Sequence, residues 1–86
     1  MKILYGSGFL RSARKLPKQQ KERLSRLLTY LQQNPYDPRL HTKPLSGGLS
    51  GLYSLRITRE WRVIFRFLAA DEIQLIDTGH RKDIYK

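Results

Sequence analysis

Basic side chains recur along the last third of the sequence at positions that suit phosphate chemistry. Arg56, Arg62 and Arg66 lie in two apolar runs with strand-like alternation, and the tail after the next run contributes His80 and Arg81. Guanidiniums gathered on one sheet face repel one another unless an anion lies between them. The pattern therefore indicates a phosphate-binding surface. For any single arginine, an ion pair with an acidic residue of the same chain is an equally good interpretation.

RNA can be cleaved without a metal when the 2'-hydroxyl attacks its own phosphate. The reaction needs a group that deprotonates the hydroxyl, cations for the developing charge and a donor for the leaving oxygen. Arg62 and Arg81 are candidates for neutralising the phosphate. His80 or Tyr85 could move protons, and Trp61 or Tyr85 could stack on a base. The sequence leaves open which group is the general base.

The composition agrees with a polyanionic partner. Lys and Arg number 17 against 7 Asp and Glu, a formal net charge of +10, and such a field attracts nucleic acid or an acidic protein. The sequence has no cysteine, no histidine and carboxylate cluster at metal-ligand spacing and no phosphate-binding glycine loop, so neither a cofactor nor a metal is expected. The absence of a long apolar segment favours a cytoplasmic protein without a membrane partner.

The length of 86 residues fits one compact domain, residues 1–86. The pattern predicts a strand at 2–5, a helix from about residue 9 to Pro17, and a second helix with one leucine stripe that ends at Asn34. Residues 34–51 lack periodicity, and strands are predicted at 52–58, 61–68 and 73–78. This order describes an α+β domain with two helices packed on one face of a mostly antiparallel four-stranded sheet.

The turn between the strands at 52–58 and 61–68 decides which side chains share a face. A two-residue turn would place Ile57 opposite Arg62 and mix a core residue with a charge. A three-residue turn, or a bulge near residue 60, keeps the faces consistent, and we predict this longer turn with Arg56 and Arg62 on the face away from the helices. The expected pairs are Thr58 with Arg62, Arg56 with Ile64 and Ser54 with Arg66.

Several blocks of the sequence resemble the RelE/ParE superfamily of bacterial type II toxins. The resemblance covers nearly the whole chain, and its more specific blocks are residues 61–65 (WRVIF) and 79–85 (GHRKDIY). It implies a toxin of the RelE/YafQ branch, an endoribonuclease that cuts mRNA in the ribosomal A site by metal-independent 2'-hydroxyl attack. It also implies a cognate antitoxin as a partner, bound over the toxin surface.

The resemblance places Arg62, Arg81 and Tyr85 in the catalytic site by position, and it places Arg56 and Ser54 on the preceding strand of the site. We expect His80 as a further catalytic residue beside Arg62, Arg81, Tyr85 and Arg56. The residues expected to bind RNA are Ser54, Trp61, Arg66, Lys82 and Lys43. Ser54 departs from the RelE pattern, which has a lysine there, and a histidine replaces Arg56 in the YafQ branch.

Two other functions are compatible with the same fold. ParE toxins share it and inhibit DNA gyrase without acting as ribonucleases, and a basic binding module without catalysis is the second alternative. The retained set of Arg62, Arg81 and Tyr85 favours the ribonuclease, because a gyrase inhibitor has no evident need for it.

Overall fold

The computed structural model describes residues 1–85, which form five strands, three α-helices and two 3₁₀ turns. The first half contains β1 (Lys2–Tyr5), α1 (Ser7–Ala13), α2 (Lys18–Gln33), the 3₁₀ turn η1 (Pro38–Leu40), β2 (Lys43–Pro44) and the 3₁₀ turn η2 (Gly47–Leu49). The second half contains β3 (Tyr53–Arg56), β4 (Trp61–Ala69), β5 (Glu72–His80) and the one-turn helix α3 (Arg81–Ile84). None of the helices among these residues is long and apolar enough to cross a membrane.

The strands form one sheet in the order β1-β5-β4-β3-β2, in which only the β1–β5 pair is parallel. The predicted α+β class and mostly antiparallel sheet are confirmed, but the sheet has five strands instead of four. The additional strand is β2, in which Lys43 lies opposite Ser54. Two residues are too short to show a pattern in the sequence, and Pro44 is tolerated because β2 is an edge strand.

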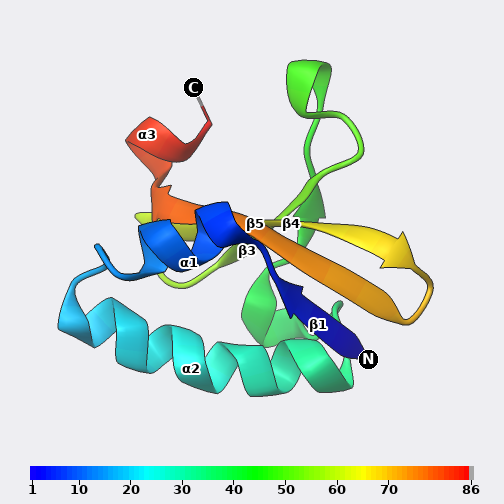
Figure 1. Cartoon of the computed structure of the whole chain (residues 1–86), viewed down its shortest axis with the longest axis horizontal. Helices are drawn as coiled ribbons and strands as arrows, with labels where there is room; N and C mark the ends of the chain where they lie inside the picture. Colours follow the sequence, from blue (N-terminus) through cyan, green and yellow to red (C-terminus); the bar gives the residue numbers. More distant parts are fainter. Residues whose placement is uncertain (86) are drawn as a thin grey trace.

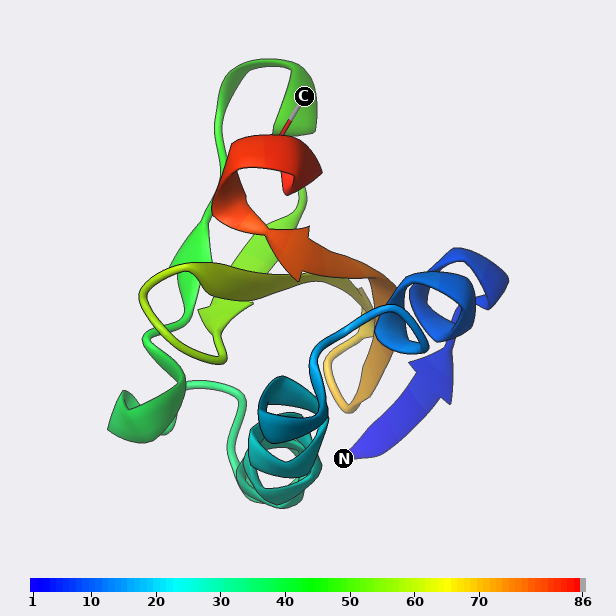
Figure 2. The same ribbon diagram turned by 90° about the vertical axis from the view of Figure 1, so that its left-hand side faces the viewer.

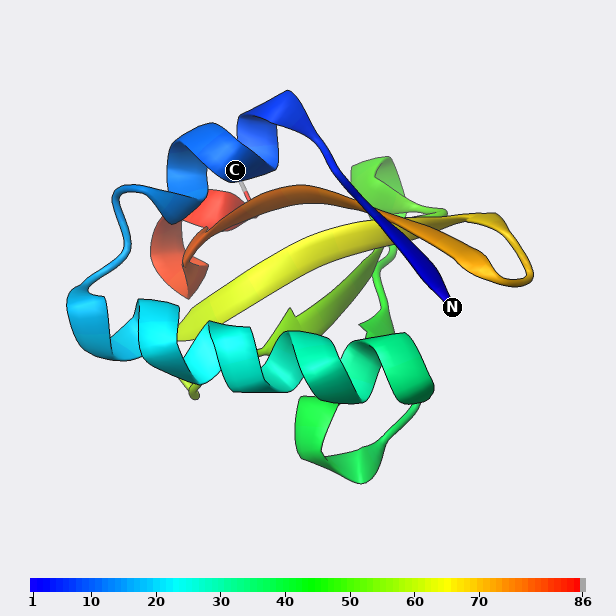
Figure 3. The same ribbon diagram turned by 60° about the horizontal axis from the view of Figure 1, so that its bottom comes forward.

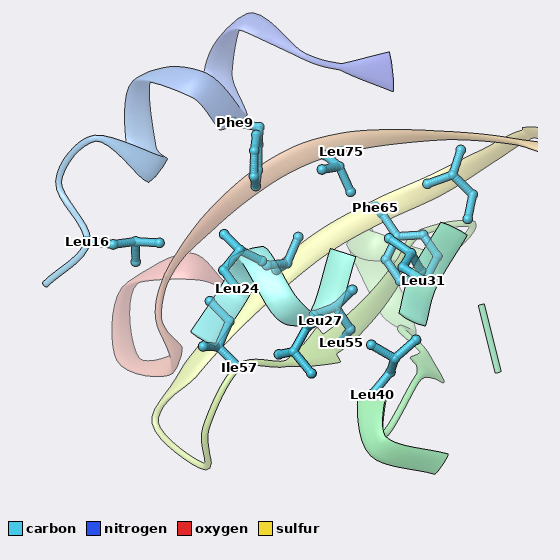
Figure 4. Close-up of a cluster of buried hydrophobic side chains, with 12 residues drawn as sticks. Phe9, Leu16, Leu24, Leu27, Leu31, Leu40, Leu55, Ile57, Phe65 and Leu75 are labelled. Atoms are coloured by element: carbon cyan, nitrogen blue, oxygen red, sulfur yellow. The ribbon is translucent and has the colours of Figure 1, made fainter. Parts of the chain in front are cut away.

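The main hydrophobic core lies between the sheet and the α1–α2 pair (Figures 1 and 3). The predicted leucine stripe is confirmed, since Leu24, Leu27 and Leu31 of α2 are all buried. They pack with apolar residues of the sheet and with Phe9 of α1 (Figure 4). A fully buried leucine stabilises a fold by about 1.5–3 kcal/mol, so this stripe attaches α2 to the sheet.

The opposite face of the sheet carries α3, a helix that the sequence pattern did not predict (Figure 2). Ile64 of β4 and Ile84 of α3 are buried but lie outside the main core cluster, and α3 packs against β4 and β5. The residues after 78 are therefore not simply a basic tail. β5 continues to His80, and the chain then folds back as a helical turn over the sheet.

The turn between β3 and β4 is longer than two residues, as predicted, but it lies at residues 58–60 instead of 59–61. Ile57, which follows β3, donates its amide to the Trp61 carbonyl at 2.8 Å, and the register differs from the expected one by two residues. Arg56 lies opposite Arg62 and Ser54 opposite Ile64. Thr58 sets this position, because its Oγ1 accepts hydrogen bonds from the amides of Glu60 and Trp61, both at 3.3 Å. A shift of two residues leaves every side chain on its expected face.

Leu31→Ala tests the role of the leucine stripe. We expect a loss of about 2–5 kcal/mol in the free energy of unfolding, because Leu31 has 0% exposure and its truncation leaves a cavity. Leu10→Ala is the matched control, since Leu10 is also helical but 45% exposed, and it should cost less than about 1 kcal/mol. Urea unfolding followed by circular dichroism measures both, and equal losses would contradict this account of the core.

Candidate functional site

Basic and polar side chains occupy the sheet face that α3 partly covers. Alternation along β3 and β4, together with their register, places five side chains on this surface, which we call the arginine face: Ser54, Arg56, Arg62, Ile64 and Arg66. Lys43 of β2 lies opposite Ser54 and extends the surface to the sheet edge. The predicted gathering of three arginines on one face is therefore confirmed, although their environments differ.

Arg62 is the most buried of these arginines, with 8% exposure. Its Nε and Nη2 donate to the carbonyl oxygen of Arg59 at 3.1 and 2.9 Å, and Thr78 Oγ1 donates to the Arg62 carbonyl at 2.8 Å. The guanidinium thus stabilises the β3–β4 turn by binding the carbonyl oxygen of Arg59, a residue of the turn. Of the guanidinium nitrogens of Arg62, a predicted catalytic residue, only Nη1 has no protein partner.

Arg56 lies directly opposite Arg62 and is half-buried. Its Nε is buried without a hydrogen-bond partner, and no described acidic residue pairs with it. Like charges opposite one another on neighbouring strands are destabilising, and an unpaired buried donor adds about 1–3 kcal/mol. An anion at Arg56 would relieve both costs.

Two further polar atoms on this side of the molecule are buried and unpaired. Ser54, 1% exposed, has no partner for Oγ, and neither has the hydroxyl of Tyr85 at the end of α3. Together with Arg56 Nε they make up three of the four such side-chain atoms in residues 1–85, the fourth being Gln20 Oε1 on α2. Buried polar groups normally have partners, so their concentration here indicates a site that accepts a polar ligand.

Glu60 connects the turn to α3, a role that the sequence did not reveal. Its carbonyl oxygen accepts from the amide of Arg81 at 2.8 Å, and its Oε2 lies 3.4 Å from His80 Nε2 and 3.5 Å from Arg81 Nε. The side chains of these three residues are 27–46% exposed, so solvent weakens the contacts of Glu60 with Arg81 and His80. Their effect is on orientation, because they fix Arg81 by Nε and leave its terminal nitrogens available.

His80 lies on the other face of the sheet from Arg56. It pairs with Trp61 in the register, and the two rings meet edge to face with centroids 5.3 Å apart. Its Nδ1 accepts from the amide of Lys82 at 3.1 Å and caps α3, so in the neutral ring the proton belongs to Nε2. The structure therefore does not bring His80 and Trp61 together with the arginine face.

The remaining predicted RNA-binding residues are exposed. Arg66 is two positions beyond Ile64 on β4, where its Nε donates to Gln74 Oε1 at 2.9 Å. Lys82 is on the outer surface of α3, and Lys43 is at the edge beside Ser54. No group of three or more His, Asp or Glu side chains in residues 1–85 is arranged to hold a metal ion.

Comparisons with known proteins show similarity over nearly the whole chain. The family model described as the ParE toxin of the type II toxin–antitoxin system ParDE matches residues 5–85. No curated protein matches the sequence.

Solved structures share the fold at low sequence identity. YafQ from Escherichia coli is 21% identical with a TM-score of 0.82, covering 99% of this chain and 98% of that chain. A YoeB/ParE toxin from Agrobacterium tumefaciens is 20% identical with a TM-score of 0.78, covering 94% and 99%. A chain of the RelBE2 toxin–antitoxin complex from Mycobacterium tuberculosis is 22% identical with a TM-score of 0.77, covering 93% and 96%. With the family match over residues 5–85, the chain belongs to the ParE toxin family of type II toxin–antitoxin systems, within the RelE/ParE superfamily.

Proposed function

We propose that this toxin is a ribosome-dependent mRNA endoribonuclease that cleaves by metal-independent attack of the 2'-hydroxyl. The observation that carries the proposal is that three buried side-chain atoms on the arginine face and on α3, Ser54 Oγ, Arg56 Nε and Tyr85 OH, have no hydrogen-bond partner. A phosphodiester suits such groups, because it offers the oxygen acceptors that an arginine and a hydroxyl require.

In the proposed reaction the 2'-hydroxyl loses its proton and its oxygen attacks the adjacent phosphorus, while the bond to the 5'-oxygen breaks and this oxygen gains a proton. The products are a 2',3'-cyclic phosphate and a free 5'-hydroxyl. Arg56 and the terminal nitrogens of Arg81 stabilise the charge that develops on the phosphate oxygens. Tyr85 is the proton-transfer group that best fits this face, because His80 lies on the opposite one. Arg62 keeps Arg56 in position by closing the turn.

A cognate antitoxin is the second part of the proposal. The solved relatives include toxin–antitoxin complexes, and the chain carries a formal net charge of +10. An acidic, partly disordered protein that folds on binding could cover such a surface and block the arginine face.

Inhibition of DNA gyrase is the alternative function. It is favoured by one observation, the match to the ParE toxin family itself. The deciding experiment is expression of the toxin in a translating extract, followed by primer-extension mapping of mRNA ends with and without ribosomes, beside a gyrase supercoiling assay. New 5' ends only in ribosome-bound message support the ribonuclease. Intact message with inhibited supercoiling supports the alternative.

Arg56→Ala, Arg81→Ala and Tyr85→Ala test the catalytic assignments. Each should lower the rate of ribosome-dependent cleavage by about 10²–10³-fold, because each removes a group that stabilises the transition state or moves a proton. Arg14→Ala is the matched control, since Arg14 is an exposed arginine at the end of α1. Full cleavage by the Arg56→Ala/Tyr85→Ala double variant would rule out this site.

Arg62→Ala separates a structural arginine from a functional one. We expect it to lower the free energy of unfolding by about 1–3 kcal/mol, because the Arg59 carbonyl loses both of its donors. Arg56→Ala removes a like-charge contact and should leave stability unchanged or raise it by up to about 1 kcal/mol. Chemical denaturation of the two variants gives the comparison, and equal destabilisation would contradict the distinction.

A further inference from the structure

A basic pocket of about 440 Å³ lies between α2 and η1, away from the arginine face. Figure 3 shows η1 beside α2 on the side of the sheet that holds the main core. Ile57 also lines the pocket and points to the face opposite that of its neighbour Arg56. We call it the α2–η1 pocket and define it by its polar lining, Arg23, Arg26, Tyr30, Arg39 and His41.

Arg39 is held in this pocket with its guanidinium plane fixed. Asp37 Oδ1 accepts from its amide and Nε at 2.9 and 3.0 Å, and Asp37 Oδ2 accepts from Nη2 at 2.8 Å. The guanidinium carbon lies 3.6 Å from the centre of the Tyr30 ring. Hydrogen bonds from Arg39 lower the pKa of Asp37 to about 2, so the pair is charged at neutral pH. The Arg39 side chain is nevertheless 59% exposed, and its outer face is available for stacking.

Arg23 and Arg26 complete the pocket without any acidic partner. They are exposed, three residues apart on α2, and neither hydrogen-bonds nor ion-pairs with a residue among 1–85. Like charges at this spacing on a helix destabilise it by a few tenths of a kcal/mol. Asp37, the acidic residue that contacts this pocket through Arg39, is already paired with Arg39. The pocket therefore has an excess of unpaired guanidinium donors.

We propose that the α2–η1 pocket binds the phosphodiester backbone of a nucleic acid. Arg23 and Arg26 contact phosphate oxygens, and the fixed Arg39 plane stacks with a base. The presence of both unpaired guanidiniums and an exposed planar group favours nucleic acid over an acidic peptide. A carboxylate could pair with Arg23 and Arg26, but it would not stack on the guanidinium plane of Arg39. The inference does not depend on cleavage, since the pocket lies on the other side of the sheet from Arg56 and contains none of the proposed catalytic residues.

The test measures binding of the full chain to a fluorescent 2'-O-methyl oligoribonucleotide, which cannot be cleaved by 2'-hydroxyl attack. Anisotropy titrations at several salt concentrations give the slope of log affinity against log salt. In Arg23→Gln/Arg26→Gln the slope should become shallower by about 1.4, because each lost phosphate contact on a single strand contributes about 0.7. The control Arg14→Gln/Lys18→Gln removes the same charge outside the pocket and should keep the slope near that of the unmodified chain.

Arg39→Lys tests the stacking plane separately from the charge. We expect affinity to fall about tenfold with little change in slope, because lysine keeps the cation but lacks a planar group. A DNA oligonucleotide of the same sequence identifies the source of the phosphate. Equal slope losses for both strands assign the site to any phosphodiester backbone, whereas a loss for RNA alone assigns it to the RNA backbone; both results support the proposal.

Two results would overturn it. One is an equal change in the slope of log affinity against log salt in Arg23→Gln/Arg26→Gln and in the control Arg14→Gln/Lys18→Gln. This result would mean that the effect depends only on the net charge of the chain. The other is a glutamate-rich peptide whose affinity depends on Arg23 and Arg26 while the nucleic acid slope does not, which would make the pocket a protein-binding site. Thermal unfolding of all variants by circular dichroism verifies that they fold. Because the probe cannot be cleaved, failure here is distinct from failure of the ribonuclease proposal.

Discussion

The turn at residues 58–60 is the constraint on which the arginine face depends. Its three-residue length fixes the register of β3 against β4 and brings Arg56 opposite Arg62. The same turn supplies the Arg59 carbonyl that holds Arg62 and the Glu60 groups that hold α3. A one-residue change in its length would exchange the two faces of β3. It would place Arg56 on the face that holds the main core.

The sequence was sufficient to predict which face of β3 and β4 each side chain lies on, but not which residues of the two strands are paired. Strand side chains alternate with a period of two. The pattern therefore accepts any pairing that places Leu55 and Ile57 opposite core residues of β4 and Arg56 opposite a residue of the other face. The two alternatives that differ by two residues place the same residues on the same faces. Thr58 selects between them through hydrogen bonds to the amides of the turn. Such local polar contacts are not visible in hydrophobic periodicity.

The short elements β2 and α3 were not predicted from the sequence for a related reason. β2 has two residues and α3 has four, and isolated segments of this length do not form on their own propensity. α3 exists because Ile84 is buried, His80 caps the turn and Glu60 holds Arg81. The His80 cap is local, but the contact of Glu60 with Arg81 joins residues more than 20 positions apart. The positions of His80 and Tyr85 relative to the arginine face therefore follow from the three-dimensional fold and not from the sequence pattern.

The arginines of this chain show why charge alone does not identify a site. Arg62 donates to a backbone carbonyl, whereas Arg39 is held by Asp37 and Tyr30 while its side chain stays 59% exposed. Arg56 has no partner among the described residues although its Nε is buried. Each unpaired buried polar group costs about 1–3 kcal/mol, a large share of the roughly 5–15 kcal/mol that stabilises a typical domain. A fold of this size tolerates such a cost where it serves binding. A cation that has no partner, or whose guanidinium face stays exposed, marks a candidate functional position better than the number of cations does.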